Sequence, residues 1–406
     1  MKSISAPIRI GYCLSLTGPV SGNSRSAQLT HDIWRDQVNI RGGLLGRPVE
    51  LVRYDDQGDG SRVASLYARL IEDDRVDLVM GGYGTNTNLA ALPEITARRR
   101  FFVGLMALGA NIELQYSDYF AMIPTGPDPN ASLTEGFFET ASLQNPRPTT
   151  VALLSADAVF SRNPILGAKA NATKYKFEIV HEATYPLTTT DFAPFLDAAA
   201  RSECDLLFLC SYLQDSVDLL RSLDRHSFRP KMVGASMIGP QNAGVRSQLG
   251  PLLNGIVNYE YWVPAPSLAF EGVDKLLKTY SSRAAGSAVD PLGHYMAPLA
   301  YSQMQVIEQA IEGTRSLNDS ALSEFTRNTE FSTVMGKIKF GVRGEWAHPR
   351  VLQVQFQNVD GSDVEQYRDG SRQVVVAPRE LASGQLIYPF ENAREAKKSD
   401  LRAKSP

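Results

Sequence analysis

The stretch VDLVMGGYGTNTNLAALPE, residues 76–94, contains the pattern that decides the fold. It runs from a short apolar segment, through a loop rich in glycine, threonine and asparagine, directly into a helical pattern. A buried strand, a turn and a helix in this order form the repeating unit of α/β proteins with parallel sheets. The loop offers several donors and no charged side chain, so we expect its backbone N–H groups and the helix N-terminus to hold a small ligand.

The same pattern recurs on both sides of this stretch. Short continuous apolar runs begin at residues 8, 49, 76 and 101, and a second series begins at 151, 177, 204 and 231. Continuous rather than alternating apolar runs are typical of parallel strands that are covered on both faces. Helical patterns separate these runs, so the sequence predicts two doubly wound α/β lobes in tandem.

Segments rich in proline interrupt the two series. One is AMIPTGPDPN, residues 121–130, and another is the strand-like run from 256, which Pro264 and Pro266 interrupt. These breaks predict chain crossings near 121–126 and 256–264. Later, MGKIKFGVRGEW and RVLQVQFQNVDG alternate and turn like a hairpin, and the last residues form a charged tail that we expect to be frayed.

Composition excludes several classes of partner. The 406 residues carry a formal net charge of −3, which gives no electrostatic case for binding nucleic acid. No apolar run is long enough to span a bilayer. The first residues lack the pattern of a secretory signal, so either the protein is cytoplasmic or a signal segment has been removed.

Motifs for cofactors and catalysis are absent from the sequence. The Gly82–Thr87 segment lacks one glycine of a dinucleotide fingerprint, and there is no P-loop or G-x-S-x-G motif. DDQGDG, from Asp55, lacks the final glutamate of a calcium loop, which favours a solvated turn. The histidines show no metal-ligand spacing, and Cys204 and Cys210 flank a strand too long for a disulfide. We therefore expect no cofactor, no metal and no enzymatic activity.

The loop in the opening stretch suits a single carboxylate or a neutral amide. Thr85 and Asn86 add side-chain donors, whereas no lysine or arginine is present for a polyphosphate. The alternative is a plain helix cap by Thr87 or Asn86. Aromatic residues follow several strands in the same way, namely Tyr83, Phe160 and Tyr212.

These motifs resemble the branched-chain amino-acid (Liv-type) periplasmic substrate-binding proteins of ABC transporters. The resemblance extends from about residue 8 to 380 and includes SLTGPVSG, the loop at Gly81 and VLQVQFQNVDG. Its most specific part is NIRGGLLGRPVELVRYDDQGD, which places family positions on Asn39, Ile40, Gly42, Gly43, Gly46, Asp55 and Asp56.

The resemblance implies a type I periplasmic-binding fold, with two lobes joined by three hinge crossings that close on a ligand. The third crossing is then expected near 336–340. The lobes are expected at 8–122 plus 264–336 and at 123–256 plus 337–385, with the charged tail at 386–406. It also implies a periplasmic protein that delivers a small-molecule ligand to a membrane ABC permease.

The resemblance also implies a set of ligand-binding residues. Thr85 takes the place of the hydroxyl that holds the ligand carboxylate, and Ala110 stands where the family has a threonine. The remaining positions are Asn23, Ser24, Tyr83, Asn86, Leu108, Gly109, Phe160, Tyr212 and Ser236.

Ser236 marks a departure from the amino-acid-binding members, which place an acid there to hold the ligand ammonium. Burying an ammonium group without a carboxylate is costly. An aromatic or keto carboxylate is therefore expected in preference to an amino acid.

Three alternatives remain. The ligand is a branched-chain amino acid after all, with Asp157 or Asp215 replacing the missing acid. The protein is a cytoplasmic amide or ligand sensor of the same fold. Or it is a hydrolase, which the missing nucleophile motifs disfavour.

Overall fold

The protein is described by a computed structural model that covers residues 6–18 and 20–395. The chain divides into two compact units, each made of two segments. Unit 1 comprises Met1–Pro127 and Phe270–Pro349, and unit 2 comprises Asp128–Ala269 and Arg350–Pro406. No helix in the described part is long and apolar enough to cross a membrane.

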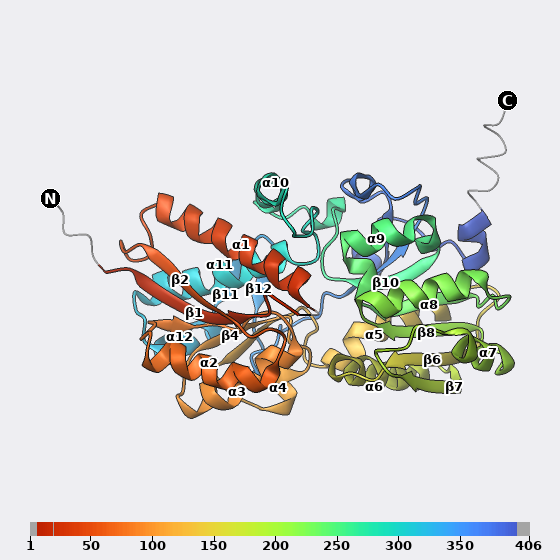
Figure 1. Cartoon of the computed structure of the whole chain (residues 1–406), viewed down its shortest axis with the longest axis horizontal. Helices are drawn as coiled ribbons and strands as arrows, with labels where there is room; N and C mark the ends of the chain where they lie inside the picture. Colours follow the sequence, from red (N-terminus) through yellow and green to blue (C-terminus); the bar gives the residue numbers. More distant parts are fainter. Residues whose placement is uncertain (1–5, 19, 396–406) are drawn as a thin grey trace. The chain divides into compact units, whose positions relative to one another are not determined.

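Unit 1 is built on parallel strands between two layers of helices (Figure 1). Its three-stranded sheet has the order β2–β1–β3, with β1 Ile8–Leu14, β2 Val49–Asp55 and β3 Leu78–Val79. A separate parallel pair consists of β4 Phe102–Leu105 and β5 Tyr119–Met122. Helix α1, Ser21–Ile40, packs against α11, Ala297–Thr314, and α2, Gly60–Glu72, packs against α3, Thr85–Ala97.

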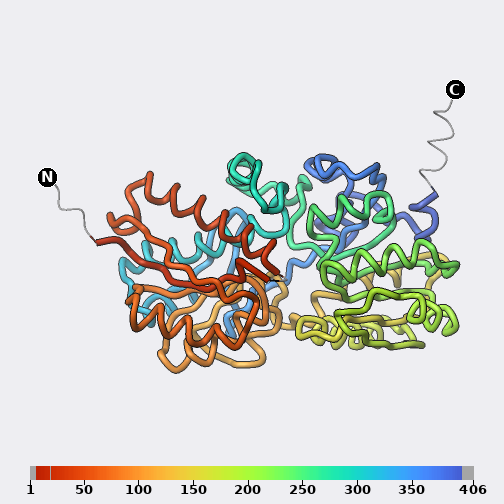
Figure 2. Tube along the Cα trace, in the orientation of Figure 1, coloured from red at the N-terminus to blue at the C-terminus, as the bar shows by residue number. Residues whose placement is uncertain are grey.

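The second segment of unit 1, Phe270–Pro349, packs among the helices and strands of the first segment. Figure 2 shows the cyan segment near residue 300 running among the red and orange strands and helices. This segment carries α11, which contacts α1 and β4. The other elements of unit 1 are α4 Ala110–Glu113, α10 Val273–Ala284, α12 Asp319–Asn328 and the antiparallel pair β11 Glu330–Thr333 and β12 Gly336–Lys339.

Unit 2 contains a seven-stranded sheet in the order β14–β13–β10–β9–β8–β6–β7. The strands are β6 Thr150–Ala156, β7 Glu178–Tyr185, β8 Leu206–Ser211, β9 Met232–Met237, β10 Ile256–Glu260, β13 Leu352–Phe356 and β14 Gln373–Ala377. Its helices are α5 Pro129–Ser142, α6 Val159–Lys174, α7 Ala193–Arg201, α8 Leu213–Arg225 and α9 Ala243–Leu249. Phe137, Phe138 and Phe208 pack together at the centre of its core.

The α/β fold class with predominantly parallel sheets is confirmed, and all eight apolar runs of the two series form strands. All three cysteines are buried and unpaired, in agreement with the sequence.

The compact units divide just after each of the predicted crossings near 121–126, 256–264 and 336–340. The units divide after residues 127, 269 and 349, because β5, β10 and β12 still pair within the preceding unit. The limits at 122, 264 and 336 therefore do not coincide with those of the compact units.

Two local predictions, the hairpin and the tail, also need correction. The hairpin between MGKIKFGVRGEW and RVLQVQFQNVDG is wrong, because β12 pairs with β11 and β13 pairs with β10 and β14. The predicted solvated turn after β2 is exposed at residues 57–60, but the Asp56 side chain before it is fully buried and accepts a hydrogen bond from Ser15 Oγ at 2.5 Å. In the predicted tail, Phe390 is buried in unit 2, and residues 396–406 lie outside the described part.

Candidate functional site

The turn between β3 and α3 is made by glycines for steric reasons. A Cβ atom on Gly82 would lie 1.9 Å from the carbonyl oxygen of Cys13, so only glycine fits. Gly84 has φ of 99°, a conformation that side chains disfavour, and helix α3 begins directly after it. No side chain in the described part caps this helix, so the N–H groups of its first turn are available to an anionic group.

Thr85 and the loop after β4, two positions that the family resemblance implies for the site, lie next to each other at this helix N-terminus. The Thr85 side chain is buried, and its Oγ1 accepts a hydrogen bond from the N–H of Leu108 at 3.1 Å. A hydroxyl group that accepts one bond still has its own O–H to donate. Gly109, with φ of 77°, and Ala110 then lead into the short helix α4.

Asn23 and Tyr83 also come together. Asn23 Nδ2 donates to the hydroxyl oxygen of Tyr83 at 2.9 Å, and the ring of Tyr83 packs edge-on against Tyr295, with 6.5 Å between centroids. Burial raises the pKa of Tyr83, so the phenol stays neutral. Ser24 is fully buried in α1, whereas Asn86 is exposed in the first turn of α3.

Phe160 and Tyr212 form the corresponding pair in unit 2. Their rings meet edge to face, with 6.1 Å between centroids, and the N–H of Phe160 donates to the hydroxyl oxygen of Tyr212 at 3.3 Å. Asp215 accepts bonds from Tyr212 N at 2.8 Å and from Tyr185 Oη at 2.9 Å. Burial raises the pKa of Asp215, and both of its oxygens are engaged by these donors, so it is poorly suited to replace a missing ammonium ligand.

Ser236 lies inside β9 rather than after it. The strand continues through Met237 because the Asn258 amide bonds both backbone groups of that residue, at 2.9 Å to N and 2.8 Å to O. The Ser236 side chain is fully buried, and its Oγ has no hydrogen-bond partner among the described residues. The first residue after the strand is the partly exposed Ile238, so an apolar side chain occupies the end of β9.

Asn88 supports this turn, a role that the sequence reasoning did not assign to it. It is fully buried in α3, and its Nδ2 donates to the carbonyl oxygens of Gly82 at 2.7 Å and Gly84 at 2.8 Å. The amide thus fixes the turn from which Thr85 projects. Asn88 was visible in the opening stretch as the last polar residue of the loop, but nothing in the pattern indicated that it would be buried or which carbonyl groups it binds.

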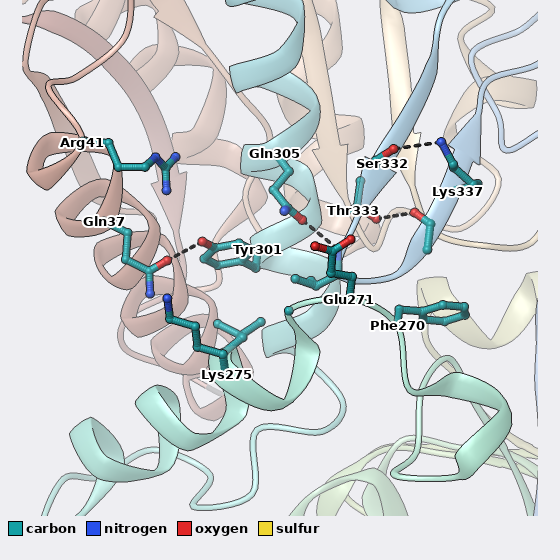
Figure 3. A pocket seen from close by; sticks show the side chains of 14 residues that line it. Gln37, Arg41, Phe270, Glu271, Lys275, Tyr301, Gln305, Ser332, Thr333 and Lys337 are labelled. Atoms are coloured by element: carbon teal, nitrogen blue, oxygen red, sulfur yellow. Dashed lines mark hydrogen bonds between the residues drawn. The ribbon is translucent and has the colours of Figure 1, made fainter.

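A separate pocket of about 510 Å³ lies in unit 1 and contains none of the predicted residues. It is lined by residues of α1, α10, α11 and the β11–β12 pair (Figure 3). Several of its polar side chains already bond to neighbours: Tyr301 to Gln37, and Lys337 Nζ to Ser332 Oγ at 2.9 Å. Among the described residues, there is no cluster of three or more acidic, histidine or cysteine side chains that could hold a metal ion.

With this geometry in place, comparison with known proteins identifies the family. The family model described as "Periplasmic binding protein" matches residues 7–362. The chain belongs to the periplasmic binding protein family, and its likeness to the Liv-type members is confirmed. This is a family of solute-binding proteins of ABC transporters and not a class of enzymes.

Similar proteins share the fold at low sequence identity. The Leu/Ile/Val-binding protein BraC3 of Rhizobium johnstonii is 20% identical over 350 residues, which cover 84% of this chain and 89% of that protein. The binding protein LivJ of Streptococcus pneumoniae in complex with isoleucine has a TM-score of 0.73 at 16% identity, covering 94% of this chain and 100% of LivJ. A solute-binding protein of Rhodopseudomonas palustris in complex with 3,4-dihydroxybenzoic acid has a TM-score of 0.72 at 18% identity, covering 87% and 94%.

Proposed function

We propose that this protein is the substrate-binding component of an ABC importer and captures a small organic carboxylate. The observation that supports this most directly is the position of the Thr85 hydroxyl. It stands at the uncapped N-terminus of α3, where the N–H of Leu108 fixes its oxygen and leaves its O–H for a ligand. In this proposal Asn23, Tyr83 and the 108–110 loop complete the polar part of the site, and Phe160 and Tyr212 supply apolar faces.

The proposed ligand is an aromatic or keto acid rather than an amino acid. No acid follows β9, since Ile238 occupies that position, and Asp215 is already engaged by two donors. A buried ammonium without a carboxylate would cost several kcal/mol, more than the extra contacts of a leucine side chain return (about 1.5–3 kcal/mol). The Rhodopseudomonas palustris relative, which holds 3,4-dihydroxybenzoic acid, provides a precedent within this fold.

The main alternative is a branched-chain amino acid, as in LivJ and BraC3. In this alternative Asp157 would supply the carboxylate for the ligand ammonium. Its side chain is exposed in the loop after β6, and Asp157 is close in sequence to Phe160 of the predicted aromatic pair. We propose a periplasmic location and a membrane permease as the partner. A cytoplasmic sensor of the same fold is the second alternative, and fractionation of cells that express the native gene separates the two.

Isothermal titration calorimetry with benzoate, 3,4-dihydroxybenzoate, phenylpyruvate, leucine and phenylalanine tests the ligand class. We expect micromolar or tighter binding of at least one of the three acids that lack an amino group. Micromolar binding of leucine with none of these acids bound would overturn the proposal. In that case, loss of leucine binding in Asp157→Asn would identify the acid that replaces the family's ammonium ligand.

A further inference from the structure

The turn that we propose to bind the ligand, residues 81–85, lies where two sheets of unit 1 meet. We call this junction between the ends of β3 and β4 the seam. Strand β3 belongs to the three-stranded sheet, whereas β4 forms a ladder with β5 and meets the segment after β3 through an isolated parallel bridge between Tyr83 and Leu105. The ends of β3 and β4 are joined by single backbone bonds, Gly81 N to Val103 O at 2.9 Å and Gly84 N to Leu105 O at 3.0 Å. The bond from Leu108 N to Thr85 Oγ1 crosses the same seam, because Thr85 follows β3 and Leu108 follows β4. The geometry of the proposed carboxylate site therefore depends on how the two sheets are held together.

Gln303 of α11 bridges this seam from a distant part of the chain. Its side chain is fully buried, and Nε2 donates to the carbonyl oxygen of Gly81 at 2.8 Å and to that of Val103 at 2.7 Å. These two acceptors lie on opposite sides of the seam. A buried amide that satisfies both carbonyl groups contributes to stability, and it also fixes their separation.

His31 determines which way the Gln303 amide points. His31 Nε2 lies 3.1 Å from Gln303 Oε1, and Nδ1 lies 3.2 Å from the Tyr12 hydroxyl. An amide oxygen only accepts hydrogen bonds, so Nε2 of the imidazole carries the proton and Nδ1 accepts from Tyr12. His31 is fully buried, and burial lowers its pKa to about 3, which keeps the ring in this neutral form. The chain Tyr12, His31, Gln303 thus presents the amide N–H groups to the seam.

We propose that Gln303, oriented by His31, is a positioning residue that sets the spacing between the β3 and β4 ends and so places Thr85 and Leu108 for the ligand. The ligand part of this inference rests on the proposed function, whereas the effect on the seam does not. Asn88 supports the turn from within α3 and reaches the carbonyl oxygen of Leu105 on β4 at 3.2 Å, and Gln303 links the turn to Val103 on the same strand.

Gln303→Met tests this role, since methionine keeps an unbranched side chain of similar length and removes both N–H donors. Gln309→Met is the matched control. Gln309 lies on the same helix and bonds the backbone of Ser332 on β11, with Nε2 to O at 2.9 Å and N to Oε1 at 3.2 Å. Both variants lose side-chain bonds to a neighbouring backbone, but only Gln303 touches the seam.

Hydrogen–deuterium exchange of the ligand-free protein provides the first measurement. In Gln303→Met we expect amide exchange to accelerate about tenfold in 81–88 and 103–108, the effect of two lost hydrogen bonds, whereas Gln309→Met should accelerate exchange only around β11. His31→Leu, which removes the group that orients the amide, should change exchange in the same segments as Gln303→Met. It also provides a second variant if Gln303→Met does not fold.

Calorimetry with benzoate, or with whichever of the tested acids the wild type binds, provides the second measurement. We expect about tenfold weaker binding in Gln303→Met and wild-type affinity in Gln309→Met. If the wild type binds none of the acids, the proposed function fails while the exchange data still test Gln303. Unchanged exchange in 81–88 in both Gln303→Met and His31→Leu would overturn the inference. So would faster exchange together with unaltered affinity for an acid that the wild type binds.

Discussion

Replacing Thr85 by alanine removes a side-chain hydroxyl whose oxygen the structure fixes at the N-terminus of α3. In the free protein its oxygen is held by the N–H of Leu108 at 3.1 Å, so the O–H is already in place when a carboxylate arrives. A hydrogen bond to a charged group contributes about 1.5–3 kcal/mol, so Thr85→Ala should weaken binding of an aromatic acid roughly ten- to hundredfold. Thr85→Ser keeps the hydroxyl and should retain most of the affinity.

The same substitution also removes the buried hydrogen bond from the N–H of Leu108 to Thr85 Oγ1, which should lower stability by about 0.5–1.5 kcal/mol. Calorimetric titration and thermal unfolding therefore have to be measured together. Thr96→Ala is the matched control, because Thr96 is exposed in the last turn of the same helix, about 16 Å away at 1.5 Å per residue. Equal affinities in the wild type and Thr85→Ala, for an acid that the wild type binds, would refute the assignment of Thr85 to the carboxylate.

Three further predictions concern stability and motion. Burial lowers the pKa of His31 to about 3, so between pH 6.5 and pH 3 the unfolded chain binds a proton that the folded chain does not. As the pH falls through this window, the free energy of unfolding of unit 1, measured with urea, should decrease by about 1.4 kcal/mol per pH unit. His31→Gln should lack this pH-dependent decrease. In unit 2, Arg246 and Glu260 form an ion pair at 3.0 Å with both side chains 1% exposed, so Glu260→Leu should cost about 3–5 kcal/mol by calorimetry, and Arg246→Met added to it should restore much of that loss. A saturating acid should reduce the radius of gyration in small-angle X-ray scattering, as expected if ligand binding closes the two units, and an unchanged radius would argue against closure.

The strands could be predicted because parallel strands covered on both faces are continuous apolar runs. The compact units divide after the predicted crossings because proline marks where a strand cannot continue, not the sheet to which the preceding strand belongs. Strand β10 ends at Glu260, four residues before Pro264, and its residues pair with β9 and β13 inside unit 2. Likewise β12 pairs with β11, whose short sequence EFST carried no strong strand pattern.

The local part of the candidate site was predictable for a related reason. Glycines, threonines and asparagines at the end of an apolar run mark a strand-to-helix turn, so Thr85 and Tyr83 could be named from the sequence. Their partners Leu108 and Asn23 were named only through the family resemblance, because the bonds between them depend on how the loops fold onto each other. The extent of β9 was missed because the Asn258 side chain, from the next strand, adds hydrogen bonds that no propensity records.

The burial and the hydrogen bonds of Gln303 could not be predicted from the sequence, for a different physical reason. In the run AYSQMQVIEQAIEG a glutamine fits the polar face of an amphipathic helix, yet this one is fully buried and bonds Gly81, 222 positions away. A buried amide is favourable only where backbone groups need partners, and they need them here because β3 and β4 do not continue one ladder. The turn that receives the proposed ligand occupies this gap between sheets, where its first-turn N–H groups are not consumed by strand pairing. The gap that leaves donors for a ligand is therefore also the gap that requires Gln303 and Asn88 to hold it in shape.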